Sequence, residues 1–337
     1  MKIITLFSGV GMQECAIKRV LPNVELINFC EFDKKISKCF ELVHQEPSEK
    51  NIGDITLLNK DDYVEKLKQD GNDDIDLIVS SFPCKSFSIQ GKKKGFEDKQ
   101  NGGLFEQSMM LVRRILPRFV IFENVKNITC KTFDGKKIMM NAMNDIGYRC
   151  YSQILNSKDY GIPQNRERFF MVCVRDSDIP FQFPDTIPLT TNVSNYLESN
   201  NHVKRSCSER LRPYMSNEYQ KKYRSNHGLR KVFDGTSQYP NVFRNGFTLH
   251  RVYSIYGNAP TFTTANDCHF WEIQGKLLPI ERWRMMGLAE KDYELLKKNN
   301  VSDGLIHKLC GNGIVVDVFY HLFLQLICTY NLSDVSL

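Results

Sequence analysis

Two cysteine arrangements that would fix the class of protein at once are missing from this chain of 337 residues. No two of its eleven cysteines are spaced as a CxxC pair, so the sequence carries no zinc-ribbon signature. Their odd number and scattered spacing argue against a disulfide framework. We therefore interpret most of them as small buried hydrophobes of a protein kept in a reducing compartment.

Targeting and membrane segments are also missing. The apolar start, MKIITLFSGVGMQE, is short and reaches Glu14 without the small-residue pattern of a cleavage site. The most apolar C-terminal stretch, VVDVFYHLFLQLICTY, is interrupted by Asp317 and His321 and is shorter than a bilayer requires. We expect a soluble, cytoplasmic protein without membrane attachment. Its net charge of +6 permits an anionic partner without demanding one.

The first half of the chain alternates short β-rich runs with helical patterns. The expected strands are KIITLF, ELINFCEF, IDLIVSSF and RFVIFEN, followed later by YSQILNS and RFFMVCV. The expected helices are GMQECAIKRVL, KKISKCFELV, LFEQSMMLVRRIL and GKKIMMNAMNDIG. Such alternation predicts an α/β fold with a doubly wound, mostly parallel sheet covered by helices on both faces.

The composition changes after about residue 180. Residues 186–272 contain eleven Lys and Arg against six Asp and Glu, and their helical periodicity is poor. LLPIERWRMMGL and GNGIVVDVFYHLFLQLI then show helical patterns again. We therefore predict a first domain over residues 1–180, an inserted smaller basic domain over 186–272, and a return to the first domain over 273–337.

The stretch FSGVG, from Phe7 to Gly11, places two glycines directly between a strand and a helix. In a doubly wound fold this turn lies at the carboxyl edge of the sheet, where ligands bind. It is not the GxGxxG of dinucleotide enzymes, and a tight turn without a ligand is the alternative interpretation. Glu31, after the second expected strand, is placed to accept hydrogen bonds from ribose hydroxyls. Asp54, expected to end a third strand, is placed to meet an adenine amino group, so the three features favour an adenosine-containing ligand without a pyrophosphate.

Cys84 follows the expected strand IDLIVSSF at the same edge of the sheet, directly after Pro83 and before several lysines. Proline restricts the backbone there, and nearby lysines favour the thiolate, which is the reactive form. Taken alone, such a cysteine is more often a buried structural residue. Glu123 ends the neighbouring strand RFVIFEN, where it could protonate or hydrogen-bond a group that Cys84 attacks.

Two arginines, Arg166 and Arg168, are spaced by two residues in QNRERFF. This spacing predicts that both lie on one face of an approaching strand. There they could hold an anion, or brace the acid and a bound base.

Eight segments of the chain resemble, in order and spacing, the motifs of bacterial and phage DNA cytosine-5 methyltransferases. They are FSGVG, EFDK, GDI, FPCKSFSIQGKKKGF, ENV, QNRER, PIERWRMMGL and GNGIV. The resemblance covers nearly the whole chain outside the basic segment. It implies the fold of S-adenosylmethionine-dependent methyltransferases, with residues 186–272 as an inserted DNA-recognition domain.

The resemblance also implies a reaction: methyl transfer from S-adenosylmethionine to carbon 5 of a cytosine flipped out of double-stranded DNA, with S-adenosylhomocysteine as product. Cys84 would add to carbon 6 and Glu123 would engage ring nitrogen 3. Arg166 and Arg168 would hold the flipped base and the glutamate. The implied cofactor contacts are Phe7, Ser8, Gly9, Gly11, Glu31, Phe32, Asp54, Ile55, Pro83, Leu104 and Asn312. The implied DNA contacts are Lys85, Ser88, Gln90, Lys92, Lys93 and Lys94, and no metal is implied.

On this interpretation the protein is a monomeric modification enzyme, with a cognate restriction endonuclease as a functional partner. Three rivals are weighed against it. A tRNA cytosine-5 methyltransferase shares the fold but carries a Cys-Phe-Thr signature, which this sequence does not contain. A non-catalytic DNA-binding relative predicts loss of Cys84 or Glu123, and both are present. A small-molecule methyltransferase leaves the basic segment without a purpose.

Overall fold

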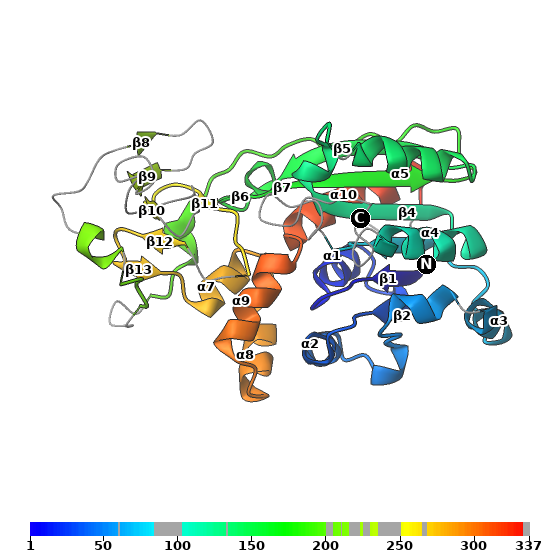
Figure 1. Cartoon of the computed structure of the whole chain (residues 1–337), viewed down its shortest axis with the longest axis horizontal. Helices are drawn as coiled ribbons and strands as arrows, with labels where there is room; N and C mark the ends of the chain where they lie inside the picture. The colour runs from blue at the N-terminus through cyan, green and yellow to red at the C-terminus, as the bar shows by residue number, and fades with distance from the viewer. Residues whose placement is uncertain are drawn as a thin grey trace. The chain divides into compact units, whose positions relative to one another are not determined.

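The computed structural model describes residues 1–59, 61–83, 103–132, 134–199, 205–209, 211–215, 223–224, 230–234, 251–264 and 268–332 (Figure 1). The chain divides into two compact units. The first comprises Met1–Leu155, Glu167–Asp185 and Phe319–Leu337, and the second comprises Asn156–Arg166 and Thr186–Val318. Each unit is therefore assembled from segments that are far apart in the sequence.

The first unit is built on a six-stranded sheet with the order β2-β1-β3-β4-β7-β5. Its strands are β1 (Lys2–Leu6), β2 (Glu25–Cys30), β3 (Leu77–Ser80), β4 (Phe119–Val125), β5 (Arg149–Asn156) and β7 (Glu167–Val174). β1 pairs in parallel with β2 and with β3, β3 pairs in parallel with β4, and β7 runs antiparallel to β4. The predicted mostly parallel α/β sheet is confirmed. The strand order reverses at β1, and open sheets of this kind bind ligands at such a reversal.

Helices cover both faces of this sheet. They are α1 (Met12–Val20), α2 (Lys34–His44), α3 (Asp61–Gln69), α4 (Gly103–Ile115), α5 (Gly135–Asn144) and α10 (Val316–Tyr330). The ring of Phe119 in β4 lies 5.2 Å from that of Tyr330 in α10, centroid to centroid. Phe29 of β2 stacks on Phe40 of α2 at 3.9 Å. Because the strand register places Phe29 and Phe119 on the same face, α2 and α10 cover that face.

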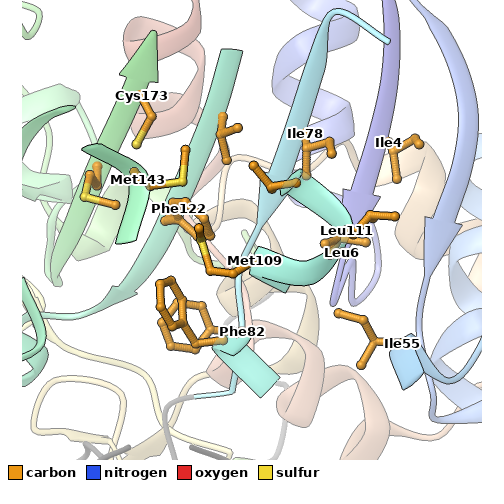
Figure 2. Packing of buried hydrophobic residues seen from close by; sticks show 14 of the residues in the cluster. Ile4, Leu6, Ile55, Ile78, Phe82, Met109, Leu111, Phe122, Met143 and Cys173 are labelled. Carbon is orange, nitrogen blue, oxygen red and sulfur yellow. The ribbon is translucent and has the colours of Figure 1, made fainter. Parts of the chain in front are cut away.

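The opposite face carries the main hydrophobic core, which Figure 2 shows from close by. Strand residues in this core include Ile4, Leu6, Ile78, Phe122 and Cys173, and helix residues include Met109 and Leu111 of α4 and Met143 of α5. All of these are fully buried. Burying one such side chain contributes roughly 1.5–3 kcal/mol, so the sheet and its edge are firmly positioned.

Among its described residues, the second unit combines short strands with three helices. Its two sheets have the orders β13-β12-β10-β9-β8 and β11-β6. The strands are β6 (Gln164–Asn165), β8 (Tyr223–Arg224), β9 (Arg230–Asp234), β10 (Arg251–Tyr253), β11 (Ala259–Pro260), β12 (His269–Phe270) and β13 (Gly275–Lys276). The helices are α7 (Pro279–Arg284), α8 (Glu290–Lys298) and α9 (Asp303–Asn312). The poor helical periodicity of residues 186–272 thus corresponds to short strands in the part of that segment that the structure describes.

The two compact units have other boundaries than the predicted domains. The second unit does not end at residue 272 but runs on to Val318, and it also takes in Asn156–Arg166. Of the predicted return over residues 273–337, only Phe319–Leu337 groups with the first unit. The reason is packing: α7 holds an ion pair with Arg205, and the amide of Val316 donates to the carbonyl of Met286 at 2.9 Å.

The C-terminal stretch Asp303–Tyr330 has 28 residues and is long and apolar enough, by composition alone, to cross a bilayer. However, 56% of its most apolar window is buried inside the protein, and the stretch is divided into α9 and α10. We interpret α10 as a core helix of the first unit's sheet.

Candidate active site

The carboxyl ends of four parallel strands lie in register at one edge of the first unit's sheet. Leu6 of β1 is paired with Cys30 of β2 and with Ser80 of β3. Ser80 is paired in turn with Phe122 of β4. The residues that directly follow these strand positions are Phe7, Glu31, Ser81 and Glu123. The glycine turn, the predicted ribose acceptor, the start of the cysteine segment and the predicted acid therefore meet at the same edge.

The glycine turn, Phe7 to Gly11, has an unusual backbone. Phe7, Gly9 and Gly11 have φ angles of 59°, 61° and 81°, a region that glycine enters at little cost. The amide of Gly9 donates to Oε2 of Glu31 at 3.0 Å, and Oε1 of Glu31 accepts from the amide of Asp33 at 2.8 Å. Glu31 thus fixes the turn against the end of β2.

The outer side of this turn is where the sequence predicts an adenosine-containing ligand. A Cβ atom added at Gly9 would meet no atom of the described residues within 4 Å, so the described part of the chain leaves the backbone open there. Phe32, directly after Glu31, is 77% exposed, which leaves a large aromatic ring in water. An open backbone, a carboxylate and an exposed ring therefore lie beside one another at this edge of the sheet.

Asp54 does not end a strand, contrary to the prediction. It lies directly before the 3-10 helix η2 (Ile55–Asn59), and the segment before it pairs with β2 through an isolated bridge between Phe29 and Asn51 instead of forming a strand. Oδ1 of Asp54 accepts from the amide and from the hydroxyl of Thr56, both at 2.9 Å. An aspartate in this position satisfies the open donors of the following helical turn, which is why the chain turns here instead of extending the sheet.

The other predicted cofactor residues lie in several places. Ser8 is buried inside the turn. Ile55 is 3% exposed, and Leu104 at the start of α4 packs against the same core. Pro83 directly precedes the cysteine. Asn312, the last residue of α9, is exposed and belongs to the second unit, whereas the other predicted cofactor residues belong to the first.

Cys84 and the predicted DNA contacts after it lie outside the described residues. These contacts are Lys85, Ser88, Gln90, Lys92, Lys93 and Lys94. The described chain reaches Pro83, and there Asn124 of β4 donates from Nδ2 to the carbonyl of Phe82 at 3.0 Å. Its Oδ1 accepts from the amide of Val125 at 2.9 Å. Asn124 therefore ties the start of the cysteine segment to β4. Sequence reasoning missed this role, although a buried amide after the apolar run FVIF was an available signal.

Glu123 and Arg168 form an ion pair across β4 and β7. Nε of Arg168 lies 3.3 Å from Oε1 of Glu123, and the two side chains are only 14% and 8% exposed. In the antiparallel register Glu123 faces Phe170 and Val125 faces Arg168, so the pair lies diagonally on one face of the sheet. A carboxylate buried this deeply requires a paired partner, and Arg168 supplies it.

Arg166 does not share a strand with Arg168, contrary to the prediction. β7 begins at Glu167, and Arg166 belongs to the second unit, where it is 1% exposed. Its guanidinium donates to three backbone carbonyls, those of Phe262 at 2.9 Å, Gly311 at 2.9 Å and Gly313 at 2.5 Å. The rigid fork of donors in arginine matches such a set of acceptors, so the side chain joins two backbone segments of the second unit.

The same two segments are held together by further contacts. A Cβ atom added at Gly311 would lie 2.4 Å from the carbonyl of Thr263, so glycine is required for this approach. Arg282 donates to the carbonyl of Thr263 at 2.7 Å, and its guanidinium lies 4.7 Å from the centre of the Phe262 ring. The threonine-rich stretch TFTT at residues 261–264 is thereby fixed against the GNG turn at 311–313.

A buried ion pair that the sequence did not reveal anchors α7 within the second unit. Arg205 contacts both carboxylate oxygens of Glu281 at 2.5 and 2.6 Å. Glu281 is fully buried, and its oxygens also accept from the amides of Glu198 at 2.8 Å and Leu278 at 2.7 Å. The carboxylate thus joins three separate pieces of chain.

Two other buried groups have displaced pKa values. Burial raises the pKa of Glu14 in α1 to about 7, against the opposing effect of the Thr5 and Ser8 hydroxyls. Burial, followed by the charge of Arg282, lowers the pKa of His307 in α9 to about 4. At neutral pH the imidazole of His307 is therefore uncharged.

Comparison with known proteins identifies the family. Residues 1–328 match the family described as C-5 cytosine-specific DNA methylase. The chain belongs to this family. It is therefore a DNA cytosine-5 methyltransferase, and its sheet is that of the S-adenosylmethionine-dependent methyltransferase fold.

Relatives of this C-5 methyltransferase are found in bacteria and in phages. The Type II methyltransferase M.HhaI of Haemophilus parahaemolyticus is 31% identical over 338 residues, covering 96% of this chain and 93% of that protein. The Type II methyltransferase M.NlaX of Neisseria lactamica is 28% identical, covering 94% and 93%. The crystal structure of the S. pombe Dnmt2 methyltransferase has a TM-score of 0.63 at 17% identity, covering 98% of this chain and 99% of that one, which shows a shared fold.

Proposed function

We propose that the protein methylates carbon 5 of cytosine within a short specific sequence of double-stranded DNA, with S-adenosylmethionine as the methyl donor. The observation that carries this proposal is the ion pair of Glu123 with Arg168. It lies at the sheet edge that also bears the glycine turn, one strand away from the strand that leads to Cys84. One reaction centre then contains the acid Glu123, the candidate nucleophile Cys84 and the glycine turn as the candidate cofactor site.

The proposed chemistry assigns one task to each side chain. The thiolate of Cys84 adds to carbon 6 of the cytosine. The carboxyl group of Glu123, in its protonated form, gives its proton to ring nitrogen 3 and so neutralises the negative charge that the addition pushes into the ring, and it takes the proton back when Cys84 leaves. Carbon 5 thereby becomes nucleophilic. When bound, S-adenosylmethionine supplies an electrophilic methyl group from its sulfonium. Loss of the carbon-5 proton then expels Cys84 as thiolate and restores the aromatic ring.

Cofactor binding is assigned to the residues around the glycine turn. Glu31 accepts from the ribose hydroxyls while it holds the turn, and Phe32 covers the adenine with its exposed ring. The open position at Gly9 lets the cofactor approach the backbone. We assign Asp54 to the adenine amino group from its place beyond β2, although it precedes a helical turn and not a strand end.

DNA binding is assigned to the lysine-rich segment after Cys84 and to the basic segment 186–272. A cytosine within a duplex is out of reach of Cys84 and has to be flipped out, at a cost of a few kcal/mol. Lysines bind phosphates, whereas arginine, asparagine and glutamine side chains hydrogen-bond base edges in the major groove.

We propose a monomer that acts on DNA in the cytoplasm, with a cognate restriction endonuclease as its functional partner, in keeping with its type II relatives. The same chemistry on tRNA is the alternative.

Trapping of the covalent adduct tests this function. In DNA that carries 5-fluorocytosine at the target, carbon 5 bears no proton to lose after methyl transfer, so the bond to Cys84 persists. With S-adenosylmethionine, a random-sequence duplex library that contains this base should give a protein–DNA adduct that survives denaturing electrophoresis. Cys84→Ala should give none, while replacement of the exposed Cys328 by alanine should leave the adduct intact. An adduct on tRNA and none on DNA would favour the alternative substrate.

A further inference from the structure

A histidine that has no part in the proposed chemistry packs against the glycine turn at Val10 and Gly11. His44 is the last residue of α2, and its Nε2 lies 3.1 Å from the carbonyl oxygen of Val10. Its ring packs on Phe40 at 4.4 Å between centroids, and Phe40 packs in turn on Phe29 of β2 at 3.9 Å. Phe29, Phe40 and His44 thus form a continuous series of ring contacts from β2 to the glycine turn.

The two glycines of the turn face different surroundings. A Cβ atom at Gly11 would lie 2.0 Å from Nε2 of His44 and 2.8 Å from the Phe40 ring. At Gly9 the same added atom would meet none of the residues that the structure describes within 4 Å. The outer glycine therefore leaves room for a ligand, whereas Gly11 leaves room for His44.

The imidazole of His44 is neutral at physiological pH. Burial, followed by the charge of Lys18, lowers its pKa to about 4, while the Val10 carbonyl and Glu46 oppose the shift. Cys15 of α1 lies 4.0 Å from Nε2, and Lys18 is ion-paired to Glu46 at 3.2 Å. A neutral ring that faces a carbonyl donates from the nitrogen that carries its proton, so Nε2–H is the donor to Val10.

We propose that His44 is a positioning residue for the cofactor. By holding the Val10 carbonyl and filling the space behind Gly11, it keeps the turn in the left-handed conformation that presents Gly9 and Phe7 to S-adenosylmethionine. Its effect is on cofactor affinity and not on the chemical step. The inference rests on the proposed cofactor, and it adds a residue outside the turn to that site.

Calorimetric titration of the purified full chain with S-adenosylmethionine tests the assignment. His44→Phe keeps most of the ring volume but removes the donor, and the dissociation constant should rise roughly tenfold, as expected for loss of one buried hydrogen bond. His44→Gln, which keeps an N–H donor, should stay within about threefold of the parent. In turnover assays KM for the cofactor should rise with His44→Phe, while kcat at saturating cofactor should change by less than about threefold.

Met139→Ala is the control for general loss of stability, because Met139 is fully buried in α5 on the core side of the sheet, outside the turn. It should lower the melting temperature without changing cofactor affinity. Unchanged affinity in His44→Phe, with a parent that binds the cofactor, would overturn the role of His44 alone. A parent that does not bind S-adenosylmethionine would overturn the proposed function and, with it, this inference.

A cofactor-free measurement tests the contact itself. Gly11→Ala should destabilise the parent more than it destabilises the His44→Ala background, because the second change removes the two His44 ring atoms at 2.0 and 2.6 Å, while the contact with the Phe40 ring at 2.8 Å stays in both. The strain of an alanine at φ 81° is common to both backgrounds and cancels in the comparison. Equal destabilisation in the two backgrounds would show that His44 does not set the requirement for glycine.

Discussion

Glu123 and Arg168 meet across two antiparallel strands, with Oε1 of the acid 3.3 Å from Nε of the arginine. Neither side chain is more than 14% exposed, so each provides the countercharge that the other needs inside the protein. The acid stands directly beyond the paired ends of β3 and β4, beside the strand that leads to Cys84. A fixed, paired carboxylate in this place is what a group acting on a flipped base requires.

Replacing this acid tests its role in the reaction. Glu123→Gln keeps the shape but removes the acidic proton that the carboxyl group can give to ring nitrogen 3, and we expect turnover to fall by about 100- to 10,000-fold. Single-turnover methylation of DNA by tritium transfer is the measurement. Glu167→Gln is the matched control, because this glutamate pairs with Lys126 at 2.9 Å on an exposed part of β7. A Glu123→Gln rate within a factor of two of the parent would refute the assignment.

The pair of Arg205 with Glu281 should be among the most stabilising contacts of the second unit. Arg205→Met leaves a fully buried carboxylate without its cation, which costs about 3–5 kcal/mol. Lys297→Met breaks the exposed pair with Asp303 and should cost less than about 1 kcal/mol.

Urea unfolding followed by tryptophan fluorescence measures this difference. Both tryptophans of the chain, Trp271 and Trp283, belong to the second unit, so the signal reports on that unit. Similar midpoints for the two variants would show that the buried pair contributes no more than the exposed one.

Glu14 should make the stability of the protein fall as pH rises. Its pKa is about 7 in the folded protein against 4.5 for an ordinary glutamate, so between these pH values the folded state binds more protons than the unfolded state. Stability therefore decreases over this window, by about 3 kcal/mol in all, and stays low above it. Glu14→Gln should remove this slope and be more stable than the parent at pH 8. Urea unfolding followed by circular dichroism from pH 4.5 to 8 checks it, and a difference between variants that does not change with pH would contradict it.

Much of the first unit could be predicted because its signals are local. Apolar runs such as Phe119–Val125 alternate with amphipathic helices, and this pattern alone indicates a parallel sheet. The position of a parallel strand's carboxyl end then follows from topology. For this reason Glu31 and Glu123 were expected at one edge of the sheet before any coordinates were known.

The remaining features depend on contacts between distant segments. Arg205 and Glu281 are 76 residues apart, and no local pattern pairs them. Arg166 was expected beside Arg168 because the spacing of two is that of a strand, but the strand begins one residue too late. The prediction that Asp54 ends a strand was wrong for a related reason. An aspartate that ends a strand and an aspartate that caps a helical turn look alike in sequence. The domain boundary at 272 was set from composition, whereas the compact unit continues through α7 to α9.

The most direct measurement is base-resolution conversion sequencing of DNA from a host that lacks cytosine methylation and expresses either this protein or its Cys84→Ala variant. The account predicts 5-methylcytosine at one short sequence motif in cells with the parent protein and none in cells with the variant. Methylation that persists in the Cys84→Ala variant would contradict the proposed nucleophile. Unmethylated DNA in cells that contain the soluble, cofactor-binding parent would contradict the assignment of DNA as the substrate.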